Sequence, residues 1–141
     1  MKFKTRAYRP LHKPGTMNKT ELEYSRHLDE MKRVGLILDW KFEVETLKLG
    51  PDCRYTPDFR VLRQEKNLIA SYGTEGEQQV IIEFHEVKGT RKVKLKGLQY
   101  TRPFVEDDAL VKVKSAAEQH PFKFIIVWKG LNGKWETREI N

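Results

Sequence analysis

The stretch from Val80 to Gly89 constrains the fold most, because an apolar run ends there in a pair of opposite charges. The run predicts a strand, and side chains two residues apart in a strand point to the same face, about 7 Å from each other. Glu86 and Lys88 are therefore presented side by side. Ile82 and Phe84 share that face and should be buried. The sequence thus predicts a rigid element that offers an acid and a base at its end.

A second strand pattern lies upstream, where Pro57-Asp58-Phe59-Arg60-Val61 alternates apolar and charged residues after a proline. This alternation is typical of a half-buried strand entered through a proline. If this strand pairs with the strand over 80–88, Asp58 and Glu86 approach each other and Lys88 stands beside them. Carboxylates hold Mg²⁺ without displacing all of its waters, and a nearby cation acts on the attacking water or the phosphate. These are the groups that metal-assisted phosphodiester hydrolysis needs.

Pro57-Asp58 followed by Glu86-Val87-Lys88 resembles the Pro-Asp…(Asp/Glu)-x-Lys signature of the PD-(D/E)XK nuclease superfamily. This superfamily includes restriction enzymes and archaeal and phage Holliday junction resolvases. The order of predicted elements over 16–128 is also similar to that of small phage endonucleases of the superfamily. The resemblance implies an α/β, restriction-endonuclease-like layered fold, with a central mixed sheet flanked by helices. It also implies a nuclease that uses Mg²⁺, with Mn²⁺ as a possible substitute, and the catalytic residues Asp58, Glu86 and Lys88.

Residues 18–34 have the pattern of a helix that begins at Asn18 or Thr20. Steps of three and four residues place Glu21 at the head of the buried stripe, whereas Glu23 lies among solvated residues. Each acid also has a capping interpretation, Asn18 with Glu21 or Thr20 with Glu23. Many nucleases of the superfamily place a glutamate of the first helix at the metal site. The resemblance therefore implies Glu21 as a catalytic and metal-binding residue, with Glu23 as the alternative.

The net charge of +7 is unevenly distributed. Residues 1–20 hold six bases and residues 89–104 hold five, with no acid in either segment, so the rest of the chain carries −4. Basic segments on such a body favour a polyanionic partner, although a basic run alone is usually a solvated surface. We expect a basic N-terminal arm over 1–17, either disordered or in contact with a partner. A single nuclease-like domain should span 18–141, with a basic insert over about 89–105.

The basic insert alternates lysine and apolar residues over 91–96, which predicts a strand with Lys92, Lys94 and Lys96 on one face. Such a strand is either an edge protected by its charges or an arm that binds phosphates. A helix over 106–120 places Lys112 on the stripe that meets the sheet, so we prefer Lys112 to Lys114 for phosphate or water positioning. The candidate nucleic-acid-binding residues are Arg91, Lys92, Lys94, Lys96, Arg102, Lys112 and Lys114.

The remaining segments complete the predicted order of helix, three strands, helix and two strands. Residues 36–49 have a strand pattern that ends in a Gly-Pro-Asp turn. Residues 64–79 have the composition of a loop or hairpin tip. Residues 122–128 are almost continuously apolar, as expected of a strand inside a sheet, and 135–140 complete a hairpin. His85 should face away from Glu86, which favours a structural role.

Length and composition set the broad class of the protein. A chain of 141 residues fits one domain, and the lone Cys53 excludes an internal disulfide or a cysteine-based zinc site. No apolar run approaches the roughly 20 residues of a membrane span, and no signal-peptide pattern opens the chain. We therefore expect no membrane partner and a cytoplasmic protein, in the host cell if a phage encodes it.

Three functions remain open at this point. The resemblance favours cleavage of branched DNA, in particular Holliday junctions, and symmetric cutting of a four-way junction requires two sites and hence a homodimer. A restriction-, repair- or transposition-type endonuclease on linear DNA is the second. The third is a non-catalytic nucleic-acid-binding module with the same fold, which the presence of Asp58, Glu86 and Lys88 disfavours.

Overall fold

The computed structural model describes residues 15–66 and 78–141, so the predicted arm over 1–17 lies almost entirely outside the described residues. The elements in chain order are α1 (Lys19–Arg33), β1 (Asp39–Phe42), β2 (Leu47–Gly50), β3 (Cys53–Tyr55), β4 (Phe59–Lys66), β5 (Gln78–Val87), β6 (Thr90–Leu95), β7 (Leu98–Pro103), α2 (Asp107–Gln119), β8 (Lys123–Lys129) and β9 (Trp135–Ile140). In this described part of the chain, no helix is long and apolar enough to cross a membrane.

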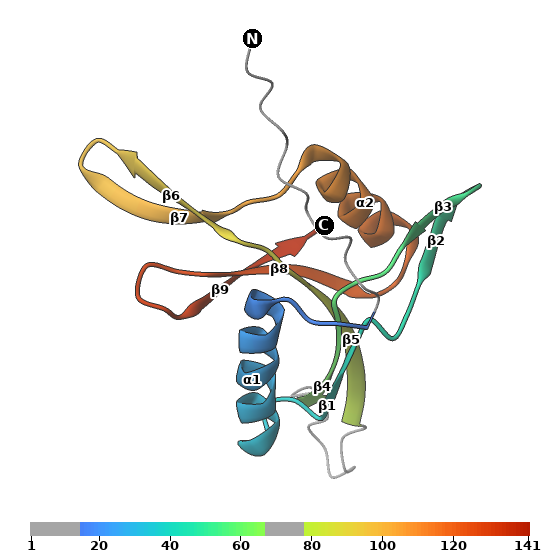
Figure 1. Cartoon of the computed structure of the whole chain (residues 1–141). Helices are drawn as coiled ribbons and strands as arrows, with labels where there is room; N and C mark the ends of the chain where they lie inside the picture. The colour runs from blue at the N-terminus through green and yellow to red at the C-terminus, as the bar shows by residue number, and fades with distance from the viewer. Residues whose placement is uncertain (1–14, 67–77) are drawn as a thin grey trace.

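The body of the molecule is a mixed five-stranded sheet in the order β1-β4-β5-β8-β9 (Figure 1). β5 and β8 are parallel, whereas the other neighbours are antiparallel. A parallel pair needs a long crossover, and the chain between β5 and β8 includes α2. The predicted order of helix, three strands, helix and two strands is therefore confirmed for the members of this sheet. The mixed α/β class is confirmed as well.

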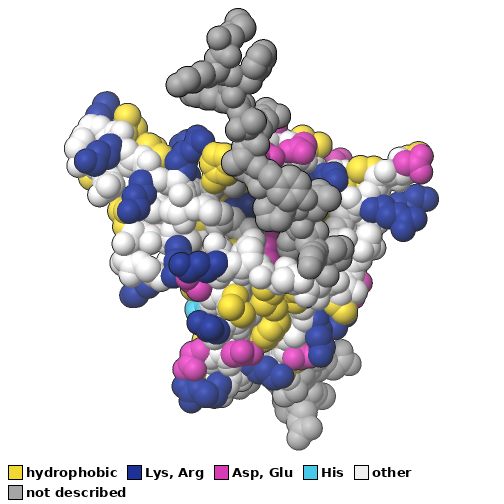
Figure 2. All heavy atoms as spheres, in the orientation of Figure 1, with side chains coloured by type: hydrophobic (Ala, Val, Ile, Leu, Met, Phe, Trp, Pro, Cys, Tyr) yellow, Lys and Arg dark blue, Asp and Glu magenta, His cyan; other side chains and the backbone are white. Residues whose placement is uncertain are grey.

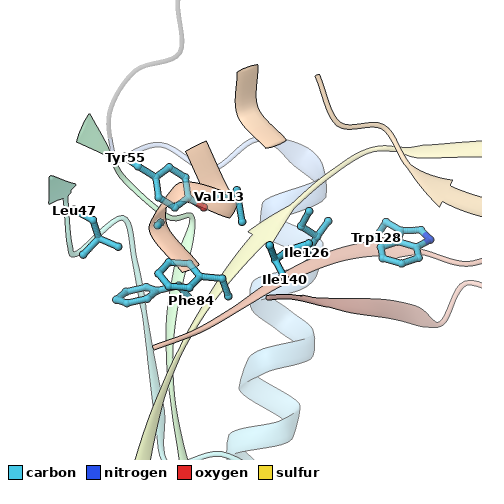
Figure 3. Packing of buried hydrophobic residues seen from close by; sticks show 9 residues of the cluster. Leu47, Tyr55, Phe84, Val113, Ile126, Trp128 and Ile140 are labelled. Carbon is cyan, nitrogen blue, oxygen red and sulfur yellow. The ribbon is translucent and has the colours of Figure 1, made fainter. Parts of the chain in front are cut away.

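The two helices pack against opposite faces of the sheet. α1 contributes Tyr24 and Leu28 to a cluster that includes Val127, whereas α2 contributes Val113 to a cluster that includes Ile126. Neighbouring residues of a strand point to opposite faces, so Ile126 and Val127 of β8 separate the two cores. Figure 3 shows the α2 side, where Val113 lies near Tyr55 of β3 and Ile126 comes from β8.

Two hairpins, β2–β3 and β6–β7, form separate two-stranded sheets that project from the body on either side of α2 (Figure 1). The strand predicted over 91–96 is present as β6, but Lys96 lies in the turn and not on the strand. Lys96 and Gly97 both have positive φ, at 49° and 77°, as a two-residue hairpin turn of type I′ requires. Lys96 therefore does not share the strand face of Lys92 and Lys94.

Two further strand predictions were wrong in their extent. The single strand predicted over 36–49 is divided into β1 and β2, which belong to different sheets. Glu43 between them has a φ of 44°, which breaks the extended backbone without a glycine to signal it. The loop predicted from Gln64 begins later, because β4 continues to Lys66 in register with β5. The middle of that loop, 67–77, lies outside the described residues.

The prediction that Lys112 lies on the stripe facing the sheet was also wrong. Lys112 is exposed, and Leu110 packs against the α2-side core instead. The helical stripe is thus rotated towards Leu110, Val113 and Ala117. Because Lys112 and Lys114 are both exposed, the fold gives no reason to prefer one of them for contact with a ligand.

Candidate active site

The pairing of β4 with β5 brings Asp58 to the end of the strand that carries Glu86. The register aligns Phe59 with His85, so the next pair along the chain would set Asp58 opposite Glu86. Asp58 lies just before β4, and its Oδ2 accepts a hydrogen bond of 2.8 Å from the backbone N–H of Val87. The two halves of the sequence signature therefore meet through a direct bond between the aspartate and the second strand.

Glu86 is held by a hydroxyl and an amine, one on each carboxylate oxygen. The Tyr55 hydroxyl donates to Oε2 at 2.5 Å, and Lys88 Nζ lies 3.3 Å from Oε1. The side chains of Glu86 and Lys88 are 12% and 21% exposed, so the pair is partly open to solvent. Lys88 itself continues the parallel pairing, since its N–H donates to the Val127 carbonyl at 2.9 Å. The acid and the amine are thus presented side by side, as the strand pattern predicts.

Glu21, in the first turn of α1, is close enough for its charge to act on Asp58. It is buried, with an exposed fraction of 5%, and forms a capping box with Asn18, whose side chain accepts from the Glu21 N–H at 2.8 Å. The carboxylate of Glu21 accepts in return from the Asn18 backbone N–H at 3.0 Å. Glu23 forms an ion pair with Lys129 instead, at 2.5 Å. Of the two alternatives, Glu21 is the one whose charge acts on Asp58.

The pKa of Asp58 is raised by burial and by the neighbouring acids. Burial, the charge of Glu86 and the charge of Glu21 raise the pKa of Asp58 from its ordinary 3.8 to about 8, while the Val87 N–H and Lys88 act in the opposite direction. A buried carboxylate among other carboxylates favours its protonated form, because each negative charge raises the cost of the next. A cation at this point would reverse that balance.

The chemistry of this acid set suits a hard divalent cation. Mg²⁺ takes oxygen ligands and is commonly held by one or two protein carboxylates, with waters and substrate phosphates completing its shell. Asp58 and Glu86 offer such a pair, and Glu21 is close enough for its charge to act on Asp58. Within the ranges 15–66 and 78–141, no three His, Cys, Asp or Glu side chains stand together as a complete ligand set.

The opposite face of β5 carries a buried polar network and no part of this acid set. His85 Nδ1 lies 2.5 Å from the Tyr24 hydroxyl, and its Nε2 lies 3.3 Å from Glu83 Oε1, which also accepts from Arg63 Nε at 3.2 Å. Burial raises the pKa of Glu83, but the hydrogen bond and charge of His85 and the charge of Arg63 outweigh it and lower the pKa overall. His85 thus faces away from Glu86, as predicted, and joins α1 to the sheet.

The candidate DNA-binding residues lie on the β6–β7 hairpin and on α2. Arg91, Lys92, Lys94, Lys96 and Arg102 are exposed on the β6–β7 hairpin, and Figure 2 shows basic side chains gathered over its projecting end. The hairpin register aligns Arg91 with Arg102, so these two share one face, while Lys92 and Lys94 occupy the other. The arginines rest on aromatic rings, Arg91 over Phe104 at 5.0 Å and Arg102 over Tyr100 at 5.5 Å.

Tyr55 is the site residue that the sequence pattern missed. It is buried, on β3, and its hydroxyl contacts Glu86 from 31 positions away in the chain. Burial, the charge of Glu86 and the hydrogen bond to Glu86 raise the pKa of Tyr55, so the phenol keeps its proton and acts as a donor. The local sequence offers one signal for Tyr55, which is its position next to the charged Arg54. In a short strand, this places Tyr55 on the inner face when Arg54 faces solvent.

The raised pKa of Asp58 predicts a pH-dependent stability. Between about pH 4 and pH 8, the folded protein keeps a proton on Asp58 that the unfolded chain releases, so the free energy of unfolding falls as pH rises through this window. Asp58→Asn removes the ionisation and keeps an acceptor for Val87. Urea unfolding at pH 5 and pH 8 should show a smaller loss in the variant, by on the order of 1 kcal/mol or more.

Asp39→Asn is the control for that measurement, because Asp39 is a surface carboxylate paired with Lys32 at 3.1 Å. Its removal should change the difference between the two pH values by less than about 0.5 kcal/mol. An Asp58→Asn protein that loses as much stability as the wild type between pH 5 and pH 8 would contradict the crowding of acids around Asp58.

Comparisons with protein-family models, with curated proteins and with solved structures found no match to this chain. The side chains around Asp58 and Glu86 are therefore the basis for inferring what the protein does.

Proposed function

We propose that this chain is a Mg²⁺-dependent DNA endonuclease that hydrolyses phosphodiester bonds, with Mn²⁺ as a possible substitute. The observation that supports it above the others is the geometry of the acids, since Asp58 accepts from the Val87 N–H at 2.8 Å and the neighbouring Glu86 carboxylate lies 3.3 Å from Lys88 Nζ. Burial and the charges of Glu86 and Glu21 raise the pKa of Asp58, because each of them disfavours its ionised form. Perturbed pKa values of this kind cluster at sites that bind or react.

Asp58 and Glu86 would hold the metal, and Glu21 would reach it directly or through a water. The ion would supply charge to the phosphate and lower the pKa of a bound water. Glu86 keeps its orientation through the Tyr55 hydroxyl at 2.5 Å. Asp58 keeps its orientation through the Val87 N–H at 2.8 Å. Both carboxylates are therefore fixed by neighbours that leave other lone pairs of their oxygens for a cation.

Lys88 would orient or deprotonate the attacking water and stabilise the charge that builds on the phosphate. Its ammonium lies 3.3 Å from Glu86 Oε1 and is 21% exposed, so it can turn from that carboxylate towards a bound phosphate. Because the backbone N–H of Lys88 is hydrogen-bonded to β8, its Cα stays fixed while the amine can change position.

The sheet order supports the restriction-endonuclease-like layering that the resemblance implies. Three antiparallel strands, β1, β4 and β5, are followed by α2 and by β8 in parallel beside β5, with the acids at the end of the central pair. We extend the proposal to branched DNA, in particular four-way junctions, and to a homodimer that supplies two sites. The projecting β6–β7 hairpin supports recognition of the shape and backbone of DNA. Its lysine and arginine side chains suit contacts with phosphates, which carry no sequence information.

Glu86→Gln or Lys88→Ala should lower the rate of DNA cleavage about a hundred-fold or more, because each removes a charge that acts at the reacting phosphate. Binding of the same DNA, measured by fluorescence anisotropy in EDTA, should stay within about three-fold, since the surface bases are unchanged. Glu23→Gln is the matched control, as Glu23 pairs with Lys129. Cleavage at the wild-type rate by both site variants would rule out this active site.

A panel of DNAs tests the substrate. Purified protein with Mg²⁺ should cut a four-way junction at least ten-fold faster than a linear duplex of equal length, because a compact dimer with basic arms binds DNA shape. EDTA should abolish both reactions. Equal rates on the two DNAs would favour a nuclease of linear DNA, and binding without cleavage under every metal condition would favour the non-catalytic module.

Replacing Lys92, Lys94 and Lys96 together by alanine should weaken DNA binding and flatten its salt dependence. Each lost phosphate contact reduces the slope of log K against log salt by about 0.9. A triple variant of Arg26, Lys41 and Lys123 loses the same charge outside the hairpin and is the control. Equal slopes for the wild type and the hairpin variant would show that these lysines do not contact DNA phosphates and belong to an ordinary solvated surface.

A further inference from the structure

A cavity of about 430 Å³ lies between the base of the β6–β7 hairpin, α2 and the strands β8 and β9. Its size falls in the roughly 300 to 1,000 Å³ range of small-molecule sites. Apolar side chains and two arginines contribute to its lining. The six that matter here are Arg102, Val105, Leu110, Ile126, Trp128 and Arg138.

The sheet register fixes how this cavity sits relative to Glu86. Glu86 pairs with Ile126 of β8, and Ile126 pairs with Arg138 of β9. Residues in register across a sheet point to the same face, so these three form one row. Neighbouring strands are about 4.8 Å apart, which places the backbone of Arg138 roughly 10 Å from that of Glu86 along the row.

The charge of the cavity is not neutralised by the acids around it. Among the residues that the structure describes, neither Arg102 nor Arg138 forms an ion pair, and both are exposed. Glu136 is the carboxylate nearest in sequence on the same face of β9, and it accepts a hydrogen bond of 2.7 Å from the Thr101 hydroxyl. The two guanidinium groups are therefore available to an anion, and their planar geometry suits phosphate.

The cavity wall is held in place before any ligand binds. Trp128 is buried, with an exposed fraction of 8%, and its indole N–H donates to the Thr101 hydroxyl oxygen at 3.2 Å. Arg102 lies over the Tyr100 ring at 5.5 Å, which limits the positions of its guanidinium. A ligand would therefore meet a fixed aromatic and aliphatic surface beside two cations, which lowers the entropy cost of binding.

We propose that this cavity binds one unpaired nucleotide of the DNA strand that is cut, with Arg102 and Arg138 on its phosphate and the Leu110 and Trp128 side of the wall against its sugar and base. The inference rests on the proposed nuclease function and adds a specificity site to it. A phosphate and a flat apolar group on one ligand match the two kinds of surface that meet in the cavity.

An unpaired nucleotide fits this cavity better than a base inside a duplex. A stacked and paired base must be extruded at a cost of a few kcal/mol before it can enter a pocket, whereas a base in a single-stranded flap, overhang or strand end is already free. The cavity would thus favour DNA that has unpaired nucleotides within reach of Asp58 and Glu86. This would favour DNA with flaps, overhangs or open strand ends over continuous duplex DNA.

Binding to the cavity is measured by NMR on the intact protein without divalent ions. The indole N–H signal of Trp128, identified with a Trp128→Phe variant, should shift on titration with the 5′-phosphorylated trinucleotide dT3. It should also shift with a DNA hairpin that carries a three-nucleotide overhang, but not with the same hairpin made blunt. Arg138→Ala should weaken dT3 binding roughly ten-fold, as loss of a charged hydrogen-bond donor predicts.

Arg26→Ala is the control, because it removes an exposed arginine from α1 on the other face of the sheet. It should leave dT3 affinity within two-fold. A Trp128 signal that does not respond to dT3, or equal affinities in the wild type and Arg138→Ala, would overturn the proposal. Inorganic phosphate that shifts the signal at the same concentrations as dT3 would also overturn it, since the site would then recognise only an anion.

This measurement separates the cavity from the nuclease proposal, because it requires no cleavage. A protein that cuts no DNA with Mg²⁺ or Mn²⁺ but shows the dT3 response would keep the nucleotide site and lose the endonuclease function. A protein that cuts DNA in the way proposed above but shows no response at Trp128 would keep the endonuclease and lose the site.

Discussion

The bond between the Asp58 carboxylate and the Val87 N–H is the contact on which the arrangement of the site depends. At that point the β4–β5 ladder ends, because Pro57 has no N–H to continue it and Asp58 turns its side chain onto the neighbouring strand. The bond fixes Asp58 to the strand that carries Glu86 and Lys88. Without it, two residues far apart in the chain would share a sheet but would have no fixed geometry at its edge.

The acids around Asp58 cost stability, and the surrounding contacts offset only part of that cost. Lys88 and the Tyr55 hydroxyl satisfy the oxygens of Glu86, and the N-terminus of α1 satisfies those of Glu21. Asp58 is left with a pKa raised to about 8. On the other face of β5, by contrast, Glu83 has a lowered pKa because His85 and Arg63 balance its charge. The same strand thus carries a neutralised network on one face and an excess of negative charge on the other, and that excess is what a cation would complete.

The sequence predicts those parts of the fold that depend on local periodicity. The alternation over 58–62, the apolar runs of β5 and β8, the capped first helix and the second helix are all present as predicted. Failures occur where a distant contact or a local backbone feature decides the outcome. The bend at Glu43 has no glycine or proline to mark it, and the orientation of α2 is set by packing of Leu110, which turns Lys112 outward. Tyr55 escaped prediction because its role comes from a hydrogen bond to Glu86, which lies 31 positions away on another strand.

The basic insert is more than an added arm, because its base forms part of the α2 side of the molecule. The Thr101 hydroxyl donates to Glu136 of β9 and accepts from Trp128 of β8, and the Thr90 hydroxyl donates to the Lys129 carbonyl. These bonds fix the hairpin to the two strands beyond β5, on the side where Glu86 and Ile126 face. The position of the hairpin relative to Glu86 is therefore set by the same sheet that positions the acids.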